Sequence, residues 1–269
     1  MRLRSSSGYD AQNESYCVIQ YEYPFNERVR TYLRLEHLFE RLGILLARET
    51  ALDHHYAFAT IFEIIEVGAR SDLKSDVLKD LEKHRQQFAS YRDNPAIAQD
   101  ILLDTISQIE SSYAALTGQP GKAGIALNDN EWVMSVRSRI GIPAGTCEFD
   151  LPAYYHWQHC STEQRRIDLT RWASTLWPLA QCISVLMKLL RDSGSPQKVM
   201  ATAGQYQQNL PQGRSFQLLR LRIEPELGLI PEISGNRLMV SVRLLSNLTE
   251  DKLPTPSGED AGLELTFCA

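Results

Sequence analysis

A single predicted strand near the start of the chain places the strongest constraint on the fold. In residues 17–24, Ile19, Tyr21 and Tyr23 alternate with Gln20 and Glu22, and Pro24 closes the segment. A period of two is typical of a half-buried strand. A strand must pair, because its backbone N–H and C=O groups need partners, yet the residues that follow have a helical pattern. We therefore expect the partner strand to come from the C-terminal end, so that the two chain ends lie together.

Apolar residues at helical spacing fill the middle of the chain, with capping residues and breakers between the segments. These signals predict about seven helices: one from Asn26 to about Ala47, then others from Asp53 to Gly68, from Ser71 to Asn94, from Ile97 to Gly118, from a cap at Asp129 through Val136, from Ser161 to Leu176, and from Pro178 to Arg191. Neighbouring helices with short connections pack as a bundle.

The hydrophobic period changes to two after the breaker segment 193–196. Residues 219–223, 238–244 and 262–267 alternate as strands do, and Tyr206 lies in a possible further strand. The sequence thus predicts an α+β fold with a helical domain over residues 25–195. A small antiparallel β-domain is expected from residues 17–24 and 196–269, and the polar residues 1–16 are predicted to be a disordered leader.

Composition excludes several classes of function. The net charge of −5 and the pI near 5.7 argue against a nucleic-acid-binding protein, because such domains usually have a pI above roughly 9. The five cysteines have no C-x-x-C spacing and suit a reducing compartment. No stretch approaches the roughly 18 apolar residues of a membrane span, and no signal peptide is evident. We expect a cytoplasmic protein without membrane insertion.

The strongest candidate for metal chemistry is the segment 156–160, and the adjacent pair His54-His55 is a weaker one. His156, His159 and Cys160 have the spacing of ligands on one helix face, so a zinc-dependent enzyme is one hypothesis. A structural role for histidines beside Trp157 is the commoner outcome. Because the sequence also lacks the phosphate-loop, nucleophile-elbow and zinc-protease motifs, we predict no enzyme activity, no metal and no cofactor.

Arginine is the more informative residue type. It recurs on predicted helices and on predicted strands, and its planar guanidinium binds carboxylates in a bidentate manner. The simpler interpretation is that most of these arginines are solvated surface charges.

Three motifs make the chain resemble the ZapD family of bacterial division proteins. Residues 24–36 read PFNERVRTYLRLE and are similar to the family's P-x-N-E-x-x-R-x-x-L-R-x-E. Residues 142–152 read IPAGTCEFDLP and are similar to I-P-G-G-x-C-x-F-D-L-P, with Trp157 in register. Residues 231–235, PEISG, resemble P-x-I-S-G before an arginine-bearing strand. The resemblance covers about residues 17–268.

The resemblance implies a homodimer without a cofactor, which binds the C-terminal tail of FtsZ and bundles FtsZ filaments at the mid-cell division site. Three positions depart from the family pattern, namely Glu131, Tyr155 and Met239, and the nearby His156 and Arg237 are expected to compensate. The residues expected to bind the acidic, apolar tail are Arg30, Arg34, Arg70, Arg137, His156, Arg237 and Arg243. A helical adaptor for another acidic partner remains the alternative.

Overall fold

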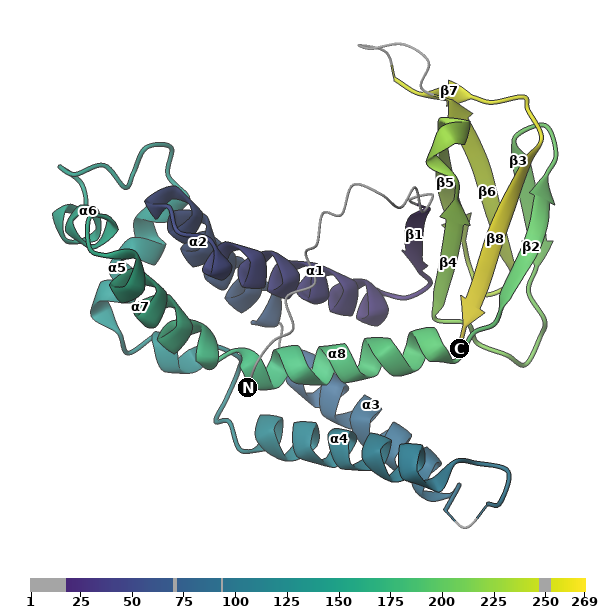
Figure 1. Cartoon of the computed structure of the whole chain (residues 1–269), viewed down its shortest axis with the longest axis horizontal. Coiled ribbons are helices and arrows are strands. Elements are labelled where there is room, and N and C mark those ends of the chain that lie inside the picture. Colours follow the sequence, from purple (N-terminus) through teal and green to yellow (C-terminus); the bar gives the residue numbers. More distant parts are fainter. Residues whose placement is uncertain (1–17, 70–71, 93, 247–252) are drawn as a thin grey trace, which may run out of the picture. The chain divides into compact units, whose positions relative to one another are not determined.

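The computed structural model describes residues 18–69, 72–92, 94–246 and 253–269 (Figure 1). The chain divides into two compact units. The helical unit comprises Glu27–Leu189, and the β-unit comprises Met1–Asn26 together with Leu190–Ala269. The predicted disordered leader, residues 1–16, lies outside the described residues.

The described residues form eight α-helices and two antiparallel sheets, which confirms the predicted α+β class. The helices are α1 (Glu27–Ala47), α2 (Ala51–Gly68), α3 (Leu73–Ala89), α4 (Gln99–Thr117), α5 (Glu131–Ile140), α6 (Pro152–Gln158), α7 (Thr162–Ser174) and α8 (Trp177–Asp192). Short 3-10 turns lie at Ile125–Leu127 and Pro225–Leu227. Helical spacing predicted seven helices, and the short helix α6 is the one that it did not predict.

Helices α1 and α2 form an antiparallel hairpin. Leu35, Leu38 and Leu42 recur at helical spacing on the buried face of α1, and each such side chain contributes roughly 1.5–3 kcal/mol when fully buried. The hydroxyl of Thr50 caps α2 by accepting a hydrogen bond of 3.0 Å from the backbone N–H of Asp53. The predicted cap of α5, Asp129, was wrong by one residue, since the side chain of Asn130 accepts from the Val133 N–H.

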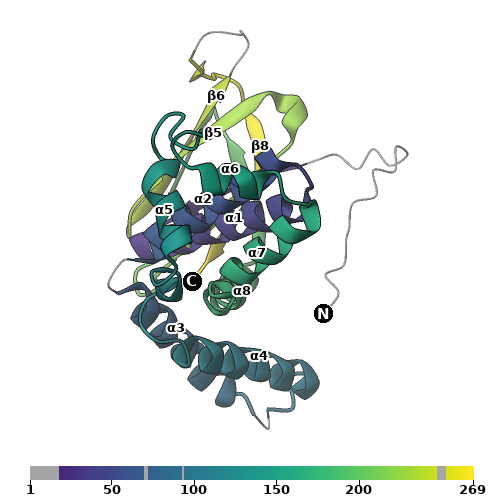
Figure 2. The same cartoon turned by 90° about the vertical axis from the view of Figure 1, so that its left-hand side faces the viewer.

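An aromatic cluster forms the part of the helical core where α2 meets α5, α6 and α7 (Figures 1 and 2). Phe58 of α2 is fully buried at its centre. Its ring centroid lies 4.8–6.2 Å from those of Phe62, Trp132, Tyr154, Trp157 and Trp172. Edge-to-face and offset ring pairs of this kind add stability beyond the area they bury.

The first strand of the β-unit finds its partner far along the chain, as predicted. Residues Ile19–Pro24 (β1) pair antiparallel with Leu218–Ile223 (β4), with Tyr21 opposite Leu221. Sheet A has the order β1-β4-β8-β2, where β8 is Ala261–Cys268 and β2 is Pro196–Ala201. Sheet B has the order β3-β6-β5, from Gln205–Asn209, Met239–Ser246 and Leu229–Gly235, and Thr255–Pro256 (β7) also pairs with β6.

The two sheets enclose one aliphatic core in which both chain ends take part. Leu219, Leu221 and Leu265 of sheet A and Val240 and Val242 of sheet B are fully buried there. The sequence predicted one small sheet, whereas the described residues form two. The strands β2 and β5 escaped prediction because Pro196 and Pro231 lie within them, and proline weakens the strand signal.

Among the described residues, no single helix is long and apolar enough to span a membrane; α7 and α8, bent by 65° at their junction, meet the length and composition test only as a pair.

Candidate functional site

The predicted arginines of α1 lie on one helix face. Arg30 forms an ion pair of 3.0 Å with Glu27, three residues before it. Arg34 follows one turn later, is exposed, and has no carboxylate partner within the part of the chain that the structure describes. Arg30 can bind a second carboxylate only with the N–H groups that Glu27 leaves free, whereas the whole guanidinium of Arg34 is available.

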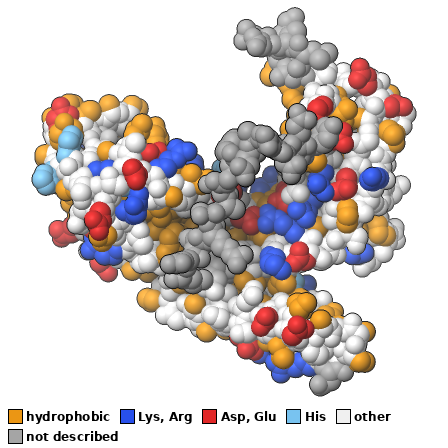
Figure 3. Space-filling view, viewed as in Figure 1, with side chains coloured by type: hydrophobic (Ala, Val, Ile, Leu, Met, Phe, Trp, Pro, Cys, Tyr) orange, Lys and Arg blue, Asp and Glu red, His pale blue; other side chains and the backbone are white. Residues whose placement is uncertain are grey.

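Two further predicted residues belong to the helical unit. The guanidinium carbon of Arg137 on α5 lies 5.9 Å from the ring centroid of Phe62, a cation–π contact, and it has no carboxylate partner among the described side chains. His156 is exposed in the last turn of α6. Histidine side chains gather at the end of the helical unit that carries α6 (Figure 3). No hydrogen bond or ion pair between described residues joins Arg137 or His156 to the arginines of α1.

Arg237 and Arg243 belong to the β-unit. Arg243 on β6 faces Glu232 on β5 and donates a hydrogen bond of 2.9 Å from Nε to its carboxylate. Arg237 is exposed in the turn between β5 and β6 and has no acidic partner in the described ranges. Arg70, the remaining predicted residue, lies outside the described residues.

The candidate metal ligands do not form a metal site. His159 Nδ1 is 2.8 Å from the carbonyl oxygen of Tyr155, and Cys160 Sγ donates to the carbonyl oxygen of His156 at 3.6 Å. Residues 18–269, apart from the undescribed gaps, contain no group of three or more histidine, cysteine, aspartate or glutamate side chains arranged to hold a metal ion. The geometry therefore gives no support to the zinc-enzyme hypothesis.

The sequence reasoning missed a buried arginine that joins three helices. Arg165 of α7 is 6% exposed and donates to the carbonyl oxygens of Glu49 at 2.8 Å and Gln158 at 3.1 Å, and also to that of Cys160. Its Nε donates at 3.0 Å to His54 Nδ1. These carbonyls follow the ends of α1 and α6, where the helix dipole favours a cation. The adjacent pair Arg165-Arg166 in an otherwise amphipathic helix was the available signal.

Burial lowers the pKa values of two histidines of α2. His54 is fully buried, and its Nε2 lies 3.0 Å from the carbonyl oxygen of Arg48. Burial is the main cause that lowers the pKa of His54, and the charge of Arg165 adds to it. Burial also lowers the pKa of His55, whose Nδ1 lies 2.8 Å from the Tyr154 hydroxyl. These groups support the fold and are not free to bind an anion.

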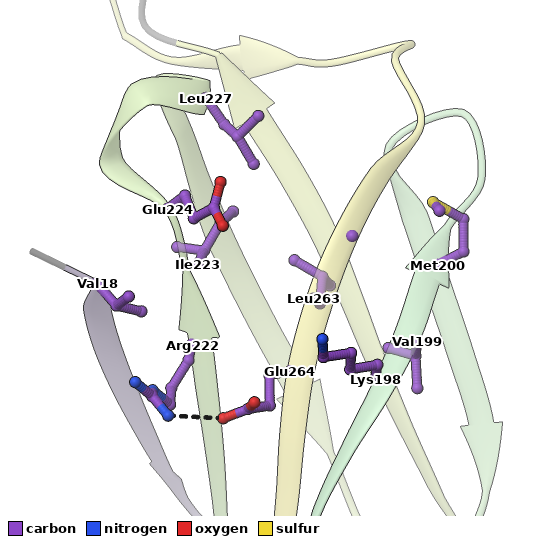
Figure 4. Close-up of a pocket in the computed structure, with 11 residues that line it drawn as sticks. Val18, Lys198, Val199, Met200, Arg222, Ile223, Glu224, Leu227, Leu263 and Glu264 are labelled. Atoms are coloured by element: carbon purple, nitrogen blue, oxygen red, sulfur yellow. Dashed lines mark hydrogen bonds and ion pairs between the residues drawn. The ribbon is translucent and has the colours of Figure 1, made fainter. Parts of the chain in front are cut away.

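A hollow of about 710 Å³ lies on the surface of the β-unit (Figure 4). Arg222 of β4 and Glu264 of β8 form an ion pair of 2.9 Å at one end of it, and Lys198 extends from β2 on the other side of β8. Glu224 and Leu227 lie near its opposite end. The two basic and two acidic side chains of the lining cancel. This hollow is therefore less suited to an acidic segment than the unpaired arginines are.

The geometry defines a class of protein: a two-unit α+β protein whose exposed arginines can bind carboxylates, with no metal-ligand group in the described residues. Comparisons with known proteins give the family. Residues 33–243 match the family described as ZapD, a cell division protein. The cell division protein ZapD of Ralstonia pickettii (strain 12J) is 50% identical over 252 residues, which are 93% of this chain and 99% of that relative. The chain belongs to the ZapD family, as its motifs predicted, and has a role in cell division.

Proposed function

We propose that this protein binds the C-terminal tail of FtsZ and cross-links FtsZ filaments, which stabilises the Z-ring at mid-cell. Family membership supports the role in division. The observation that carries the choice of partner is that Arg34 and Arg237 are exposed guanidiniums without acidic partners among the described residues, although the whole chain has a net charge of −5. Unpaired basic side chains on an acidic protein favour an acidic segment over nucleic acid.

The proposed mechanism needs no catalytic step and no cofactor. Arginines bind tail carboxylates while apolar side chains of the tail pack against the surface. An exposed ion pair contributes about 0–1 kcal/mol, so one tail binds weakly. Two copies of this chain in a homodimer present two sites, and bundling then depends on multivalent attachment to filaments.

The test is co-sedimentation with GTP-assembled FtsZ, using full-length FtsZ and FtsZ without its C-terminal tail. We expect pelleting of this protein only with full-length FtsZ. Raising the salt should reduce pelleting, because the Debye length is about 8 Å at physiological ionic strength. Equal pelleting with tail-less FtsZ would place the contact elsewhere on FtsZ. No pelleting with either form would favour the adaptor hypothesis with another acidic partner.

A further inference from the structure

A small tryptophan-lined cavity lies in the helical unit, and none of its lining residues was predicted for tail binding. Its volume is about 200 Å³. Its lining side chains come from the start of α5, from the short helix α6 and from α7. Its lining residues are Asn130, Trp132, Trp157, Asp168, Arg171 and Trp172. This volume is below the roughly 300–1,000 Å³ of small-molecule sites, so it suits one side chain rather than a whole ligand.

The walls of the cavity are flat aromatic surfaces. The rings of Trp132 and Trp172 are stacked with centroids 5.2 Å apart, and the ring of Trp157 lies 5.8 Å from that of Trp132. Trp132 is only partly buried, so its aromatic surface reaches solvent. The buried indole N–H of Trp172 has no hydrogen-bond acceptor among the described residues. Buried polar groups normally have a hydrogen-bond partner, so the indole N–H without an acceptor distinguishes this wall from an ordinary hydrophobic core.

The rim of the cavity presents the guanidinium of Arg171 to solvent. Asp168 is largely covered, and it accepts hydrogen bonds from Trp157 Nε1 at 3.2 Å, Gln164 Nε2 at 3.2 Å and Arg171 Nη2 at 2.8 Å. Arg171 is 65% exposed, and its guanidinium carbon lies 5.6 Å from the centroid of the Trp172 ring. Its remaining N–H groups can bind a carboxylate that arrives beside the cavity.

A cationic ligand is a poor fit for this arrangement. Aromatic walls with a carboxylate can hold a cation, but here the Asp168 carboxylate already has three donors and the Arg171 guanidinium already lies over Trp172. An apolar side chain with a neighbouring carboxylate uses both parts of the site: the tryptophan surfaces and the exposed guanidinium.

We propose that this cavity takes one apolar side chain of the acidic FtsZ tail, while Arg171 binds the carboxylate of a neighbouring tail residue. The inference rests on the proposed function and adds an apolar anchoring site to it. Apolar anchors in pockets usually carry more of the binding energy of a peptide than the exposed charges around them.

The experiment measures binding of a synthetic peptide of the FtsZ C-terminal tail by isothermal titration calorimetry. Arg171→Ala should weaken binding about threefold, as the loss of an exposed charge pair does, and Trp132→Leu about tenfold, as the loss of an anchoring contact does. The matched control is Arg85→Ala, because Arg85 also pairs with a carboxylate three residues before it, Glu82, at 2.8 Å. The Arg85→Ala variant should bind the tail peptide with the affinity of the wild type.

A second peptide, with its apolar residues changed to serine and its acids kept, identifies the anchor. Wild-type protein should lose affinity for this peptide, and Trp132→Leu should lose much less on the same change, since coupled partners are not additive. If Trp132→Leu does not fold by circular dichroism, Arg171→Ala with the two peptides decides, because Arg171 is mostly exposed.

The outcomes separate this inference from the proposed function. Wild-type affinity in both Arg171→Ala and Trp132→Leu, together with weakened binding by Arg34→Glu, would overturn the cavity and leave tail binding intact. No binding of the tail peptide to the wild type would overturn both the role of the cavity and the proposed binding of the FtsZ tail.

Discussion

The helical unit and the β-unit stabilise themselves with different residues. The helical unit is built from one continuous stretch and contains all four tryptophans, three of them packed around Phe58. The β-unit joins the two ends of the chain around a core of leucine, valine and isoleucine. Tryptophan fluorescence therefore reports unfolding of the helical unit alone, and the two units can be followed separately.

Arginine also has different partners in the two units. In the helical unit Arg165 is buried against backbone carbonyls. In the β-unit Arg191 and Arg220 both pair with the carboxylate of Glu22, at 2.7 and 3.2 Å. The backbone fixes these carbonyl oxygens, so the loss of Arg165 leaves partly buried acceptors without their donor. Substitution of a glutamate by glutamine, in contrast, removes the carboxylate charge and keeps the size of the side chain. The predictions below test this difference between the two units.

Arg165→Ala should have the largest effect on stability. It leaves the carbonyl groups of Glu49, Gln158 and Cys160 without their donor, and unsatisfied buried polar groups cost about 1–3 kcal/mol each. We expect the helical unit to lose about 3 kcal/mol, measured by urea unfolding followed by tryptophan fluorescence.

The control on the same helix is Arg171→Ala, whose side chain is 65% exposed. It should change the unfolding free energy by less than about 0.5 kcal/mol. Equal urea midpoints for the two variants would contradict the structural role assigned to Arg165.

Glu22→Gln should destabilise the β-unit by a smaller amount. It weakens a bidentate pair with Arg191, with N–O distances of 2.8 and 2.7 Å, in which both side chains are mostly buried. Charge-assisted hydrogen bonds of this kind contribute about 1–2 kcal/mol. Hydrogen exchange at β1 and β4, followed by mass spectrometry, measures the loss.

Glu232→Gln is the matched control in the β-unit, because Glu232 and Arg243 are both 53% exposed. An exposed pair contributes about 0–1 kcal/mol, so this variant should exchange at nearly the wild-type rate. Faster exchange in Glu232→Gln than in Glu22→Gln would reverse the proposed ranking.

The fold class could be predicted because both kinds of periodicity are local signals. The alternation of Tyr21 and Tyr23 with Glu22 requires a partner strand, and the partner was correctly expected from the C-terminal end. The order of the strands and the division into two sheets could not be predicted, because pairing between distant segments depends on packing. The strands of Pro196 and Pro231 were hidden by residues that suppress strand propensity.

The candidate site could be predicted less completely. Sequence shows where an arginine is, but the partner of Arg243 on another strand and the burial of Arg165 against carbonyls are tertiary facts. The tryptophan-lined cavity was equally hidden, since Trp132, Trp157 and Trp172 come from three separate helices. The family resemblance supplied the positions of the candidate arginines, but it could not show which of these arginines lack a carboxylate partner.

The helical unit should also be the more sensitive to mild acid. The pKa of buried His54 lies below its ordinary value of 6.5, and burial lowers the pKa values of His55 and His84 too. The unfolded chain then binds more protons, so this stability is present above about pH 6.5 and is lost as the pH falls. Tryptophan-detected urea unfolding at pH 7.5 and pH 5 should show the loss.

His54→Gln should reduce the difference in stability between the two pH values, and the exposed His37→Gln should not. Wild-type pH dependence in His54→Gln would assign the acid sensitivity to other groups.

The smallest predicted effects distinguish free from paired arginines in tail binding. Arg34→Ala should weaken binding of the FtsZ tail peptide about threefold, whereas the exposed Lys83→Ala on α3 should leave it unchanged. Glu232→Gln removes the charge that Arg243 now pairs with, so it should strengthen binding about twofold if Arg243 lies in the site. Calorimetric titration measures all three variants. Weaker binding by Glu232→Gln would mean that the β5–β6 pair stabilises the sheet and that Arg243 does not bind the tail.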